Sequence, residues 1–267
     1  MLSTHSLSSS ARARTSALEE MDALVALDSM KEDFGGPFLF DLKSYNISSS
    51  KQRSNEIMGR YGVPMPRPWP ECGFPAIVKP SCQSGSVGVS EVENKEQMDA
   101  ALKRVEELGD TPVIQEFVHG KSISIEVIGN GTSARSYITT EVVLDRNYDC
   151  KQVLCHPGIL SEEEDTRFGL CAKMTAEDMG LNGLMDMEAI DTPNGFRVLE
   201  IDARIPSQTP ACILAGTGIN RTVSNRLLHC LSAFSNATFN FTSAASKSSK
   251  SSSSDFSAFA NSNRNVR

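Results

Sequence analysis

Apolar and polar positions alternate most clearly between residues 185 and 210. Thr192-Pro193-Asn194-Gly195 is a turn cluster between two strand-like runs, and this pattern predicts a β-hairpin. Because side chains alternate along a strand, one face of the second strand should carry Leu199, Ile201, Ala203 and Ile205. The other face should carry Glu200, Asp202 and Arg204. The hairpin would therefore have one core face and one charged face.

The register of this hairpin predicts a cation site. If the loop is 193–195, Thr192 pairs with Phe196, and counting outward places Glu188 opposite Glu200. Directly opposed like charges are destabilising unless something positive lies between them. A hard divalent cation such as Mg²⁺ fits, with Mn²⁺ as an alternative, because it takes carboxylate oxygens together with nucleotide phosphates. The predicted metal ligands are Glu188, Glu200 and Asp202; the plain alternative is a half-exposed hairpin with a charged outer face.

The same patterns predict an α+β protein along the rest of the chain. Helices are expected at about 18–27, at 51–60 after an N-cap at Ser50, at 96–108 after a capping pair of Asn94 and Gln97, at 162–179 and at 219–231. Strands are expected at 38–40, 74–79, 113–118, 122–128 and 136–144, with a turn at 129–131 joining the last two. On 122–128, one face would carry Ser122, Ser124 and Glu126.

Composition narrows the function classes. The 267 residues carry 26 basic and 33 acidic side chains, no long basic run, and only four Tyr and one Trp, so nucleic acid is not an expected partner. No apolar run approaches the ~18 residues of a membrane span, and the N-terminus lacks the apolar core of a secretory signal. We expect a cytoplasmic protein without a membrane partner. Seven Cys without a Cys-x-x-Cys pair indicate neither a zinc site nor a disulfide framework, and are expected to be reduced core residues.

The two ends differ in composition from the middle. Residues 1–18 are rich in Ser, Ala and Thr and contain no acidic residue, which is typical of a transit peptide or of a non-native or disordered leader. Residues 233–267 are expected to be a disordered Ser-rich tail, because the tract from Ser243 onward contains almost no aliphatic side chains.

Two further stretches could bind a nucleotide. Lys79 ends a predicted strand and precedes the small-residue loop 81–89, whose amides could wrap phosphate oxygens. The loop is not a Walker A motif, in which the Lys follows the glycines, and a plain surface loop would look similar. Residues 115–118 lie at the end of another strand, before His119-Gly120, and could offer backbone groups to an adenine ring or simply form an edge strand.

The order of these elements resembles the ATP-grasp family. Lys51 at a helix start, Lys79 before a Gly/Ser loop, and Glu116-x-Val118 before Gly120 are followed by Glu188 and Glu200-x-Asp202-x-Arg204. The resemblance covers residues from about 48 to 231. Within that family the stretches SSSKQRSN, FPAIVKPSCQSGSVGV, QEFVHGKSISIEV and LEIDARIPSQTP, followed by TGIN, are similar to the ligases of pyrrolysine biosynthesis that join 3-methyl-D-ornithine to lysine.

The resemblance implies an ADP-forming ligase that makes an amide through an acyl phosphate. ATP phosphates would be held by Lys51 and Lys79, and the adenine by Gln115, Glu116, Phe117 and Val118; Ser84 and Glu200 are further expected nucleotide-binding residues. Mg²⁺ would be held by Glu188, Glu200 and Asp202. Arg204 would be the catalytic charge that stabilises the transferring phosphoryl group, unless it only forms a salt bridge to Asp202.

The implied substrates are the amino acids lysine and 3-methyl-D-ornithine. Candidate substrate contacts are Ser122, Ser124, Glu188, Arg204, Ser207, Gln208 and Thr209, with Glu126 and Glu141 as weaker ones. Two positions depart from the common family pattern: Ser122 stands where a ribose-binding Glu is frequent, and Asp202 replaces the commoner Asn. The alternatives are a non-catalytic ATP- and Mg²⁺-binding fragment and an ATP-grasp ligase or carboxylase with another substrate; a homodimer stays open.

The resemblance also implies a domain division. Residues 19–47 would be the remnant of a pre-ATP-grasp domain, and 48–232 the ATP-grasp domain itself. Because the start of the preceding domain is expected to be missing, we expect the chain to bind ATP and Mg²⁺ better than it ligates amino acids.

Overall fold

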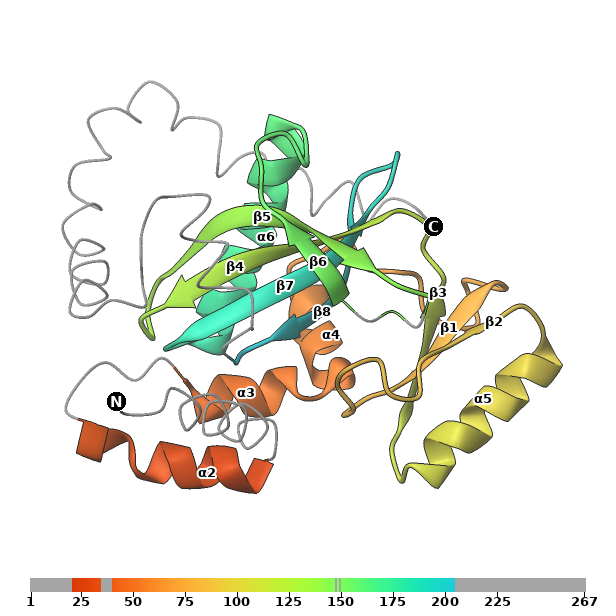
Figure 1. Ribbon diagram of the computed structural model, residues 1–267, viewed down its shortest axis with the longest axis horizontal. Coiled ribbons are helices and arrows are strands. Elements are labelled where there is room, and N and C mark those ends of the chain that lie inside the picture. The colour runs from red at the N-terminus through yellow and green to blue at the C-terminus, as the bar shows by residue number, and fades with distance from the viewer. Residues whose placement is uncertain (1–20, 35–39, 147, 149, 205–267) are drawn as a thin grey trace, which may run out of the picture.

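The computed structural model describes residues 21–34, 40–146, 148 and 150–204, which form two antiparallel sheets flanked by helices (Figure 1). The helices are α2 (Met21–Ser29), α3 (Leu42–Ser48), α4 (Lys51–Arg60), α5 (Lys95–Glu107) and α6 (Glu162–Met179), with a 3-10 helix η1 (Lys31–Phe34). The strands are β1 (Ala76–Pro80), β2 (Ser90–Val92), β3 (Pro112–Glu116), β4 (Lys121–Gly129), β5 (Ala134–Leu144), β6 (Cys150–Leu154), β7 (Leu184–Asp191) and β8 (Arg197–Asp202). This mixed content confirms the predicted α+β class.

The smaller sheet has the strand order β2-β1-β3 and is covered by α5. Its small core consists of Ala76, Val78, Val92, Met98, Ala101 and Val105. The predicted capping pair is confirmed: the N–H of Gln97 donates to Asn94 Oδ1 at 2.9 Å, and the N–H of Glu93 donates to Gln97 Oε1 at 2.7 Å. These two bonds satisfy amide donors that a helix start leaves unpaired.

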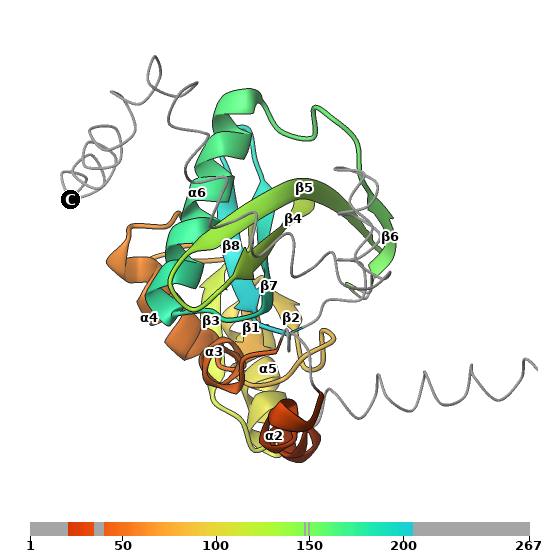
Figure 2. The same cartoon turned by 90° about the vertical axis from the view of Figure 1, so that its left-hand side faces the viewer.

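The larger sheet has the order β6-β5-β4-β7-β8, and α6 lies along one of its faces (Figure 2). Apolar side chains of β4, β7 and β8 point toward this helix and meet residues such as Phe168 and Ala172 in the main core. Ser122, Ser124 and Glu126 of β4 pair with Ile190, Glu188 and Asp186 of β7. Since directly opposed residues share a face, the polar set lies on the face away from α6.

The β7–β8 hairpin differs from the predicted one in two compensating ways. Its loop has two residues, because the N–H of Gly195 donates to the carbonyl of Thr192 at 3.0 Å. Ala189 pairs with Val198, whereas Glu188 pairs with Glu200, so Leu199 is an extra residue in β8 and forms a bulge. The predicted loop was wrong by one residue, and the bulge restores the predicted Glu188–Glu200 pair.

Several expected elements need correction. Phe40 lies outside any strand, and α3, which Asp41 caps by accepting from the N–H of Lys43 at 3.1 Å, was not predicted. The short strands β2 and β6 were also missed. The expected helix at 219–231, residue Ile205, and the leader and tail lie outside the described residues. Within the described part of the chain, no helix has the length and apolar character that a membrane crossing requires.

Candidate functional site

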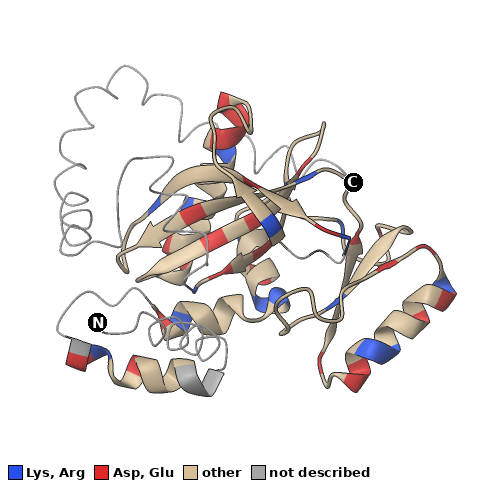
Figure 3. Cartoon of the chain, in the orientation of Figure 1, with Lys and Arg blue, Asp and Glu red and all other residues tan. Residues whose placement is uncertain are grey.

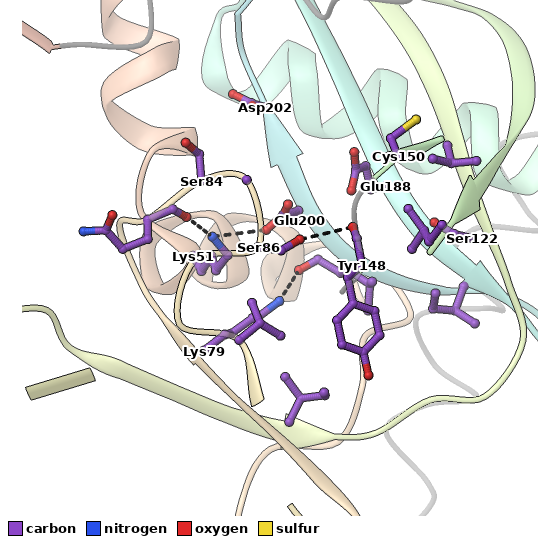
Figure 4. A pocket seen from close by; sticks show the side chains of 18 of the residues that line it. Lys51, Lys79, Ser84, Ser86, Ser122, Tyr148, Cys150, Glu188, Glu200 and Asp202 are labelled. Carbon is purple, nitrogen blue, oxygen red and sulfur yellow. Dashed lines mark hydrogen bonds and ion pairs between the residues drawn. The ribbon is translucent and has the colours of Figure 1, made fainter. Parts of the chain in front are cut away.

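A cavity of about 740 Å³ lies between the two sheets and is lined by β1, β3, β4, β7 and β8 together with the loop 82–87 and the turn before β6. Such a volume suits a ligand of the size of a nucleotide or drug. Figure 4 shows that Lys51, Lys79, Glu188 and Glu200 point into this space from different elements. The structure therefore gathers side chains that are up to 149 positions apart, since Lys51 and Glu200 are in direct contact.

Lys51 is positioned by the start of α4. The Ser50 side chain caps this helix as predicted, accepting from the N–H of Arg53 at 3.4 Å, and its hydroxyl lies 3.2 Å from Ser81 Oγ. The N–H of Lys51 also donates to the carbonyl of Ser81 at 2.9 Å. Its Nζ donates to the carbonyl of Gln83 at 2.8 Å and lies 3.2 Å from Glu200 Oε2. The helix start is thus fixed to the Gly/Ser loop and to β8 at once.

Lys79 is a buried cation at the same end of the cavity. Its side chain is only 5% exposed, and Nζ donates to the carbonyl of Leu199, the bulged residue of β8, at 3.2 Å. Burial lowers the pKa of Lys79, because the charged form loses hydration, while nearby Glu200 acts in the opposite direction. Glu200 therefore sits beside two ammonium groups.

Two rows of acidic side chains cross the cavity face of the larger sheet. One row contains the cross-strand pair Glu188 and Glu200, and the next contains Asp186 opposite Asp202. Figure 3 shows acidic positions on adjacent strands in the middle of this sheet. Burial raises the pKa of Glu188 to about 8, and Glu200 and Asp202 act in the same direction. This acid face is therefore short of positive charge at the Glu188 end.

The rest of the acid face is partly neutralised by the protein. Burial would raise the pKa of Glu200, but the Lys51 and Lys79 ammonium groups outweigh it and hold that pKa below its usual value. Burial raises the pKa of Asp202 to about 6, against the effect of Arg204, whose Nε lies 2.6 Å from Asp202 Oδ2. The ion pair that was the plain alternative for Arg204 is therefore present.

The three predicted metal ligands do not form a ready cluster. In the described part of the chain, His, Cys, Asp and Glu side chains form no group of three that could hold a metal ion. Glu188 and Glu200 are direct cross-strand neighbours, while Asp202 belongs to the next row and pairs with Arg204. Like charges separate and turn to available cations when nothing bridges them, so Glu200 faces Lys51 and Asp202 faces Arg204.

The predicted adenine segment lines the other end of the cavity. Gln115 is buried, and Phe117 and Val118 contribute to the wall. The Glu116 carboxylate instead accepts from the Arg67 guanidinium at 3.0 and 3.2 Å, and this bond lowers the pKa of Glu116. The N–H groups of Glu116 and Phe117 donate to the carbonyls of Arg67 and Pro75. These two amides are therefore engaged within the fold rather than offered to a ligand.

The Gly/Ser loop meets the turn before β6 across the cavity. Ser84 lines the wall, Ser86 Oγ donates to the carbonyl of Tyr148 at 3.2 Å, and the Tyr148 hydroxyl lies 3.5 Å from Glu91 Oε2. Both Ser86 and Tyr148 have positive φ, 60° and 64°. Tyr148 was not among the predicted site residues. The local sequence pattern gives no indication that the turn before β6 contacts the Gly/Ser loop.

The cysteine prediction is wrong at two positions. Cys82 and Cys150 are exposed and line the cavity, because they lie in the Gly/Ser loop and at the start of an edge strand. Cys171 is a buried core residue as predicted, and its burial raises the pKa of the thiol to about 12. Cys212 and Cys230 lie outside the described residues.

The predicted substrate contacts fall in different places. Ser122 lines the cavity; Ser124 is buried, and its hydroxyl donates to Asp186 Oδ2 at 3.5 Å. Glu141 lines the wall and lies 3.6 Å from Lys121 Nζ. Ser207, Gln208 and Thr209 lie outside the described residues. Asp186 was missed, although the register count that paired Glu188 with Glu200 also pairs Asp186 with Asp202.

Comparisons with known proteins identify the family and the relatives of this chain. A family model described as the D-Ala-D-Ala ligase C-terminus matches residues 68–208. The 3-methyl-D-ornithine–L-lysine ligase of Methanosarcina acetivorans is 38% identical over 202 residues, which cover 76% of this chain and 52% of that protein. The chain spans about half the length of the curated relatives of this name that it matches.

Solved structures share the fold. The biotin carboxylase domain of the Hydrogenobacter thermophilus 2-oxoglutarate carboxylase, in complex with MgADP, ADP and bicarbonate, has a TM-score of 0.65 and 21% identity, and the match covers 76% of this chain and 49% of that chain. The VanG D-Ala:D-Ser ligase of Enterococcus faecalis has a TM-score of 0.60 and 21% identity over 73% of this chain and 64% of that chain. At these identities the similarity shows the fold alone.

Proposed function

This chain belongs to the ATP-grasp family, through its D-Ala-D-Ala ligase C-terminal domain, and on that premise we propose that it serves an ATP-dependent, ADP-forming amide ligase. The observation that carries the proposal is the arrangement of Lys51, Lys79 and Glu200 at one end of the cavity, with Glu188 directly across from Glu200. Two cations, together with an acid pair that is short of positive charge at Glu188, are complementary to a polyphosphate bound with a divalent cation.

The residues present fit Mg²⁺ and a nucleotide. The pKa of Glu188 is raised to about 8 because its carboxylate is buried near other acids, and a divalent cation would relieve this repulsion. Two protein carboxylates are sufficient for Mg²⁺, which usually takes one or two from the protein and the remainder from phosphates and water. We propose Glu188 and Glu200 as the first ligands, and Asp202 as a third that would turn from Arg204.

Different residues of the cavity would bind the phosphates and the purine of ATP. Lys51 and Lys79, together with the loop carrying Ser84, hold the phosphate end, and the purine lies against Phe117, Val118 and Gln115. The bound Mg-ATP supplies the phosphoryl group that activates a carboxylate for attack by an amine. Arg204 lies beside Asp202, in the row next to Glu188 and Glu200, and its charge would stabilise the transferring phosphoryl group.

The proposed substrates follow the curated relatives, whose name specifies 3-methyl-D-ornithine and L-lysine. The carboxylate of the first would be activated, and the ε-amine of the second would attack it, in pyrrolysine biosynthesis. Ser122 and Ser124 are proposed as polar substrate contacts, and Ser207, Gln208 and Thr209 keep this role as proposals from the sequence. We also propose residues 48–232 as the ATP-grasp domain, with 19–47 belonging to a preceding domain.

The test is product formation by the full chain. ATP, Mg²⁺, lysine and 3-methyl-D-ornithine should give ADP and a single amide of the two amino acids, identified by mass spectrometry. Equal yields with unrelated amino acids would reject the substrate assignment. Calorimetry with Mg-ATP measures nucleotide binding separately, so a chain that binds ATP without forming product would support the non-catalytic fragment instead.

A further inference from the structure

We propose that Asp186, in the row of acids beyond Glu188, binds the side-chain ammonium group of the amino acid whose carboxylate is activated. The inference rests on the proposed ligase function and adds a specificity-determining residue to it. Its ligand is an α,ω-diamino acid, and a neutral amino acid of the same length would lack the group that Asp186 recognises.

The register of the sheet places Asp186 at the centre of a carboxylate row. Glu126 of β4 lies directly opposite Asp186 of β7, and Asp202 of β8 lies opposite it on the other side. Glu126 is 0% exposed and Asp186 3%, whereas the Asp202 side chain is 29% exposed and lines the cavity. The row therefore begins at Asp202 in the cavity wall and continues to Asp186 and Glu126, which are buried on the same polar face and do not line the cavity.

One oxygen of Asp186 lacks a partner. Among the described residues, Asp186 Oδ1 accepts no hydrogen bond, and Oδ2 has only the long contact of 3.5 Å from Ser124 Oγ. A buried acceptor left unsatisfied costs free energy. Asp186 Oδ1 therefore requires a hydrogen-bond donor. An ammonium group has three N–H donors and a positive charge.

The surrounding chemistry selects an ammonium over other ligands. An anion would meet acidic side chains on three adjacent strands. A second metal ion would have to compete with the Arg204 guanidinium for Asp202, because Arg204 Nε lies 2.6 Å from Asp202 Oδ2. An ammonium needs only two or three acceptors at hydrogen-bond distance, which Asp186 can supply together with the Ser124 hydroxyl.

The position of Asp186 along β7 fits the distance between the carboxylate and the side-chain amine of a bound diamino acid. On β7, Glu188 and Asp186 are two residues apart on one face, a step of about 7 Å. Glu188 faces the phosphate end, and Asp202 and Arg204 line the wall beside the next step. A carboxylate held beside Arg204 for phosphorylation would direct its side chain past Asp202 toward Asp186.

The test compares two ligands that differ by one amine. In the presence of Mg²⁺ and a non-hydrolysable ATP analogue, the full chain should bind D-ornithine at least about tenfold more tightly than D-norvaline, because a charge-assisted hydrogen bond is at stake. The near-isosteric substitution Asp186→Asn should remove most of this preference by weakening D-ornithine alone. Asp99→Asn, an exposed Asp→Asn change on α5, is the matched control and should keep the preference.

Two results would overturn the proposal. Equal affinities of the wild-type chain for D-ornithine and D-norvaline, or no binding of either, would do so without any variant. An Asp186→Asn chain that folds and keeps the full preference would show that Asp186 only shares a proton with its acidic neighbours. Failure of the proposed function would look different: Mg-nucleotide binding or amide formation would be absent, whichever amino acid is preferred.

Discussion

The Nζ of Lys79 donates a hydrogen bond of 3.2 Å to the carbonyl oxygen of Leu199, which lies 120 positions further along the chain. The bond joins the end of β1 in the smaller sheet to the bulge of β8 in the larger sheet. It is available because the bulge leaves Leu199 outside the paired register. One irregular residue therefore fixes a buried cation at the phosphate end of the cavity.

Replacing Lys79 should separate ligand binding from folding. Lys79→Met keeps the length and apolar stem of the side chain but removes the charge, and we expect Mg-ATP affinity to fall at least about tenfold, a loss of roughly 1.4 kcal/mol. The ligand-free protein should lose little stability, because burying the ammonium is itself unfavourable. Calorimetry and thermal melting measure the two effects. Lys103→Met, an exposed change on α5, is the control and should leave ATP affinity unchanged.

Glu200→Gln should abolish turnover dependent on Mg²⁺ while leaving the fold intact, because it removes one proposed metal ligand at nearly constant volume. Asp202→Asn should be milder, since an amide oxygen can still bind the cation. A magnesium titration of ADP release measures both variants, with the exposed Glu93→Gln as control. Normal magnesium dependence in Glu200→Gln would exclude this residue from the metal site.

The raised pKa of Glu188 predicts a pH dependence of stability. The folded carboxyl has a pKa of about 8 against an ordinary value of 4.5, so the folded state binds more protons than the unfolded state between these values. The free energy of unfolding should therefore fall as pH rises from about 4.5 to about 8, by an amount on the order of 5 kcal/mol, since each unit by which the folded pKa is raised corresponds to about 1.4 kcal/mol. Denaturation in the presence of a metal chelator measures this slope.

One variant and one metal titration test this interpretation of Glu188. Glu188→Gln should reduce the slope in the same pH window without abolishing it, because Asp202, whose pKa is raised to about 6, still titrates there. Added Mg²⁺ should raise the stability of the wild-type protein chiefly at the upper end of the window, where Glu188 is ionised. A slope that is unchanged in Glu188→Gln would assign the titration to another residue.

Glycines at two positions should respond to alanine with opposite signs. A Cβ on Gly120 would lie 2.0 Å from the carbonyl oxygen of Asp191, so Gly120→Ala should destabilise the protein by more than about 2 kcal/mol through forced backbone movement. Gly59 lies inside α4, where a Cβ would meet only Met65 Cε at 3.8 Å, and Gly59→Ala should stabilise the helix by about 0.5–1 kcal/mol. Urea denaturation compares the two; a neutral Gly120→Ala would contradict the close approach of β4 to the end of β7.

Local patterns predicted the capped helices and the acid pair. Ser50 and Asn94 act as N-caps, α6 has its expected bounds, and Glu188 faces Glu200, because these features depend on short-range spacing. The bulge at Leu199, the contact of Ser86 with Tyr148 and the ion pair of Glu116 with Arg67 depend on how distant segments pack, and no periodicity encodes them.

The exposed positions of Cys82 and Cys150 show the same limit. Burial of a small residue such as cysteine follows from which neighbours the fold brings over it, and composition says nothing of that. Asp186 is the opposite case, because strand alternation and the hairpin register were sufficient to place it beside Asp202. Asp186 lies outside the family pattern, which contains Glu188, Glu200 and Asp202.

The two hydrophobic cores have no residue in common: one is built mainly on α4, α6 and the larger sheet, and the other on α5 and the smaller sheet. Polar contacts join them, such as that of Lys79 with the carbonyl of Leu199 and that of Lys51 with the carbonyl of Gln83. A nucleotide bound between the two sheets would contact both parts of the protein. It would therefore couple the folding of two parts that have separate hydrophobic cores. Ligand occupancy would then decide whether heat or denaturant unfolds the chain in one cooperative step or in two.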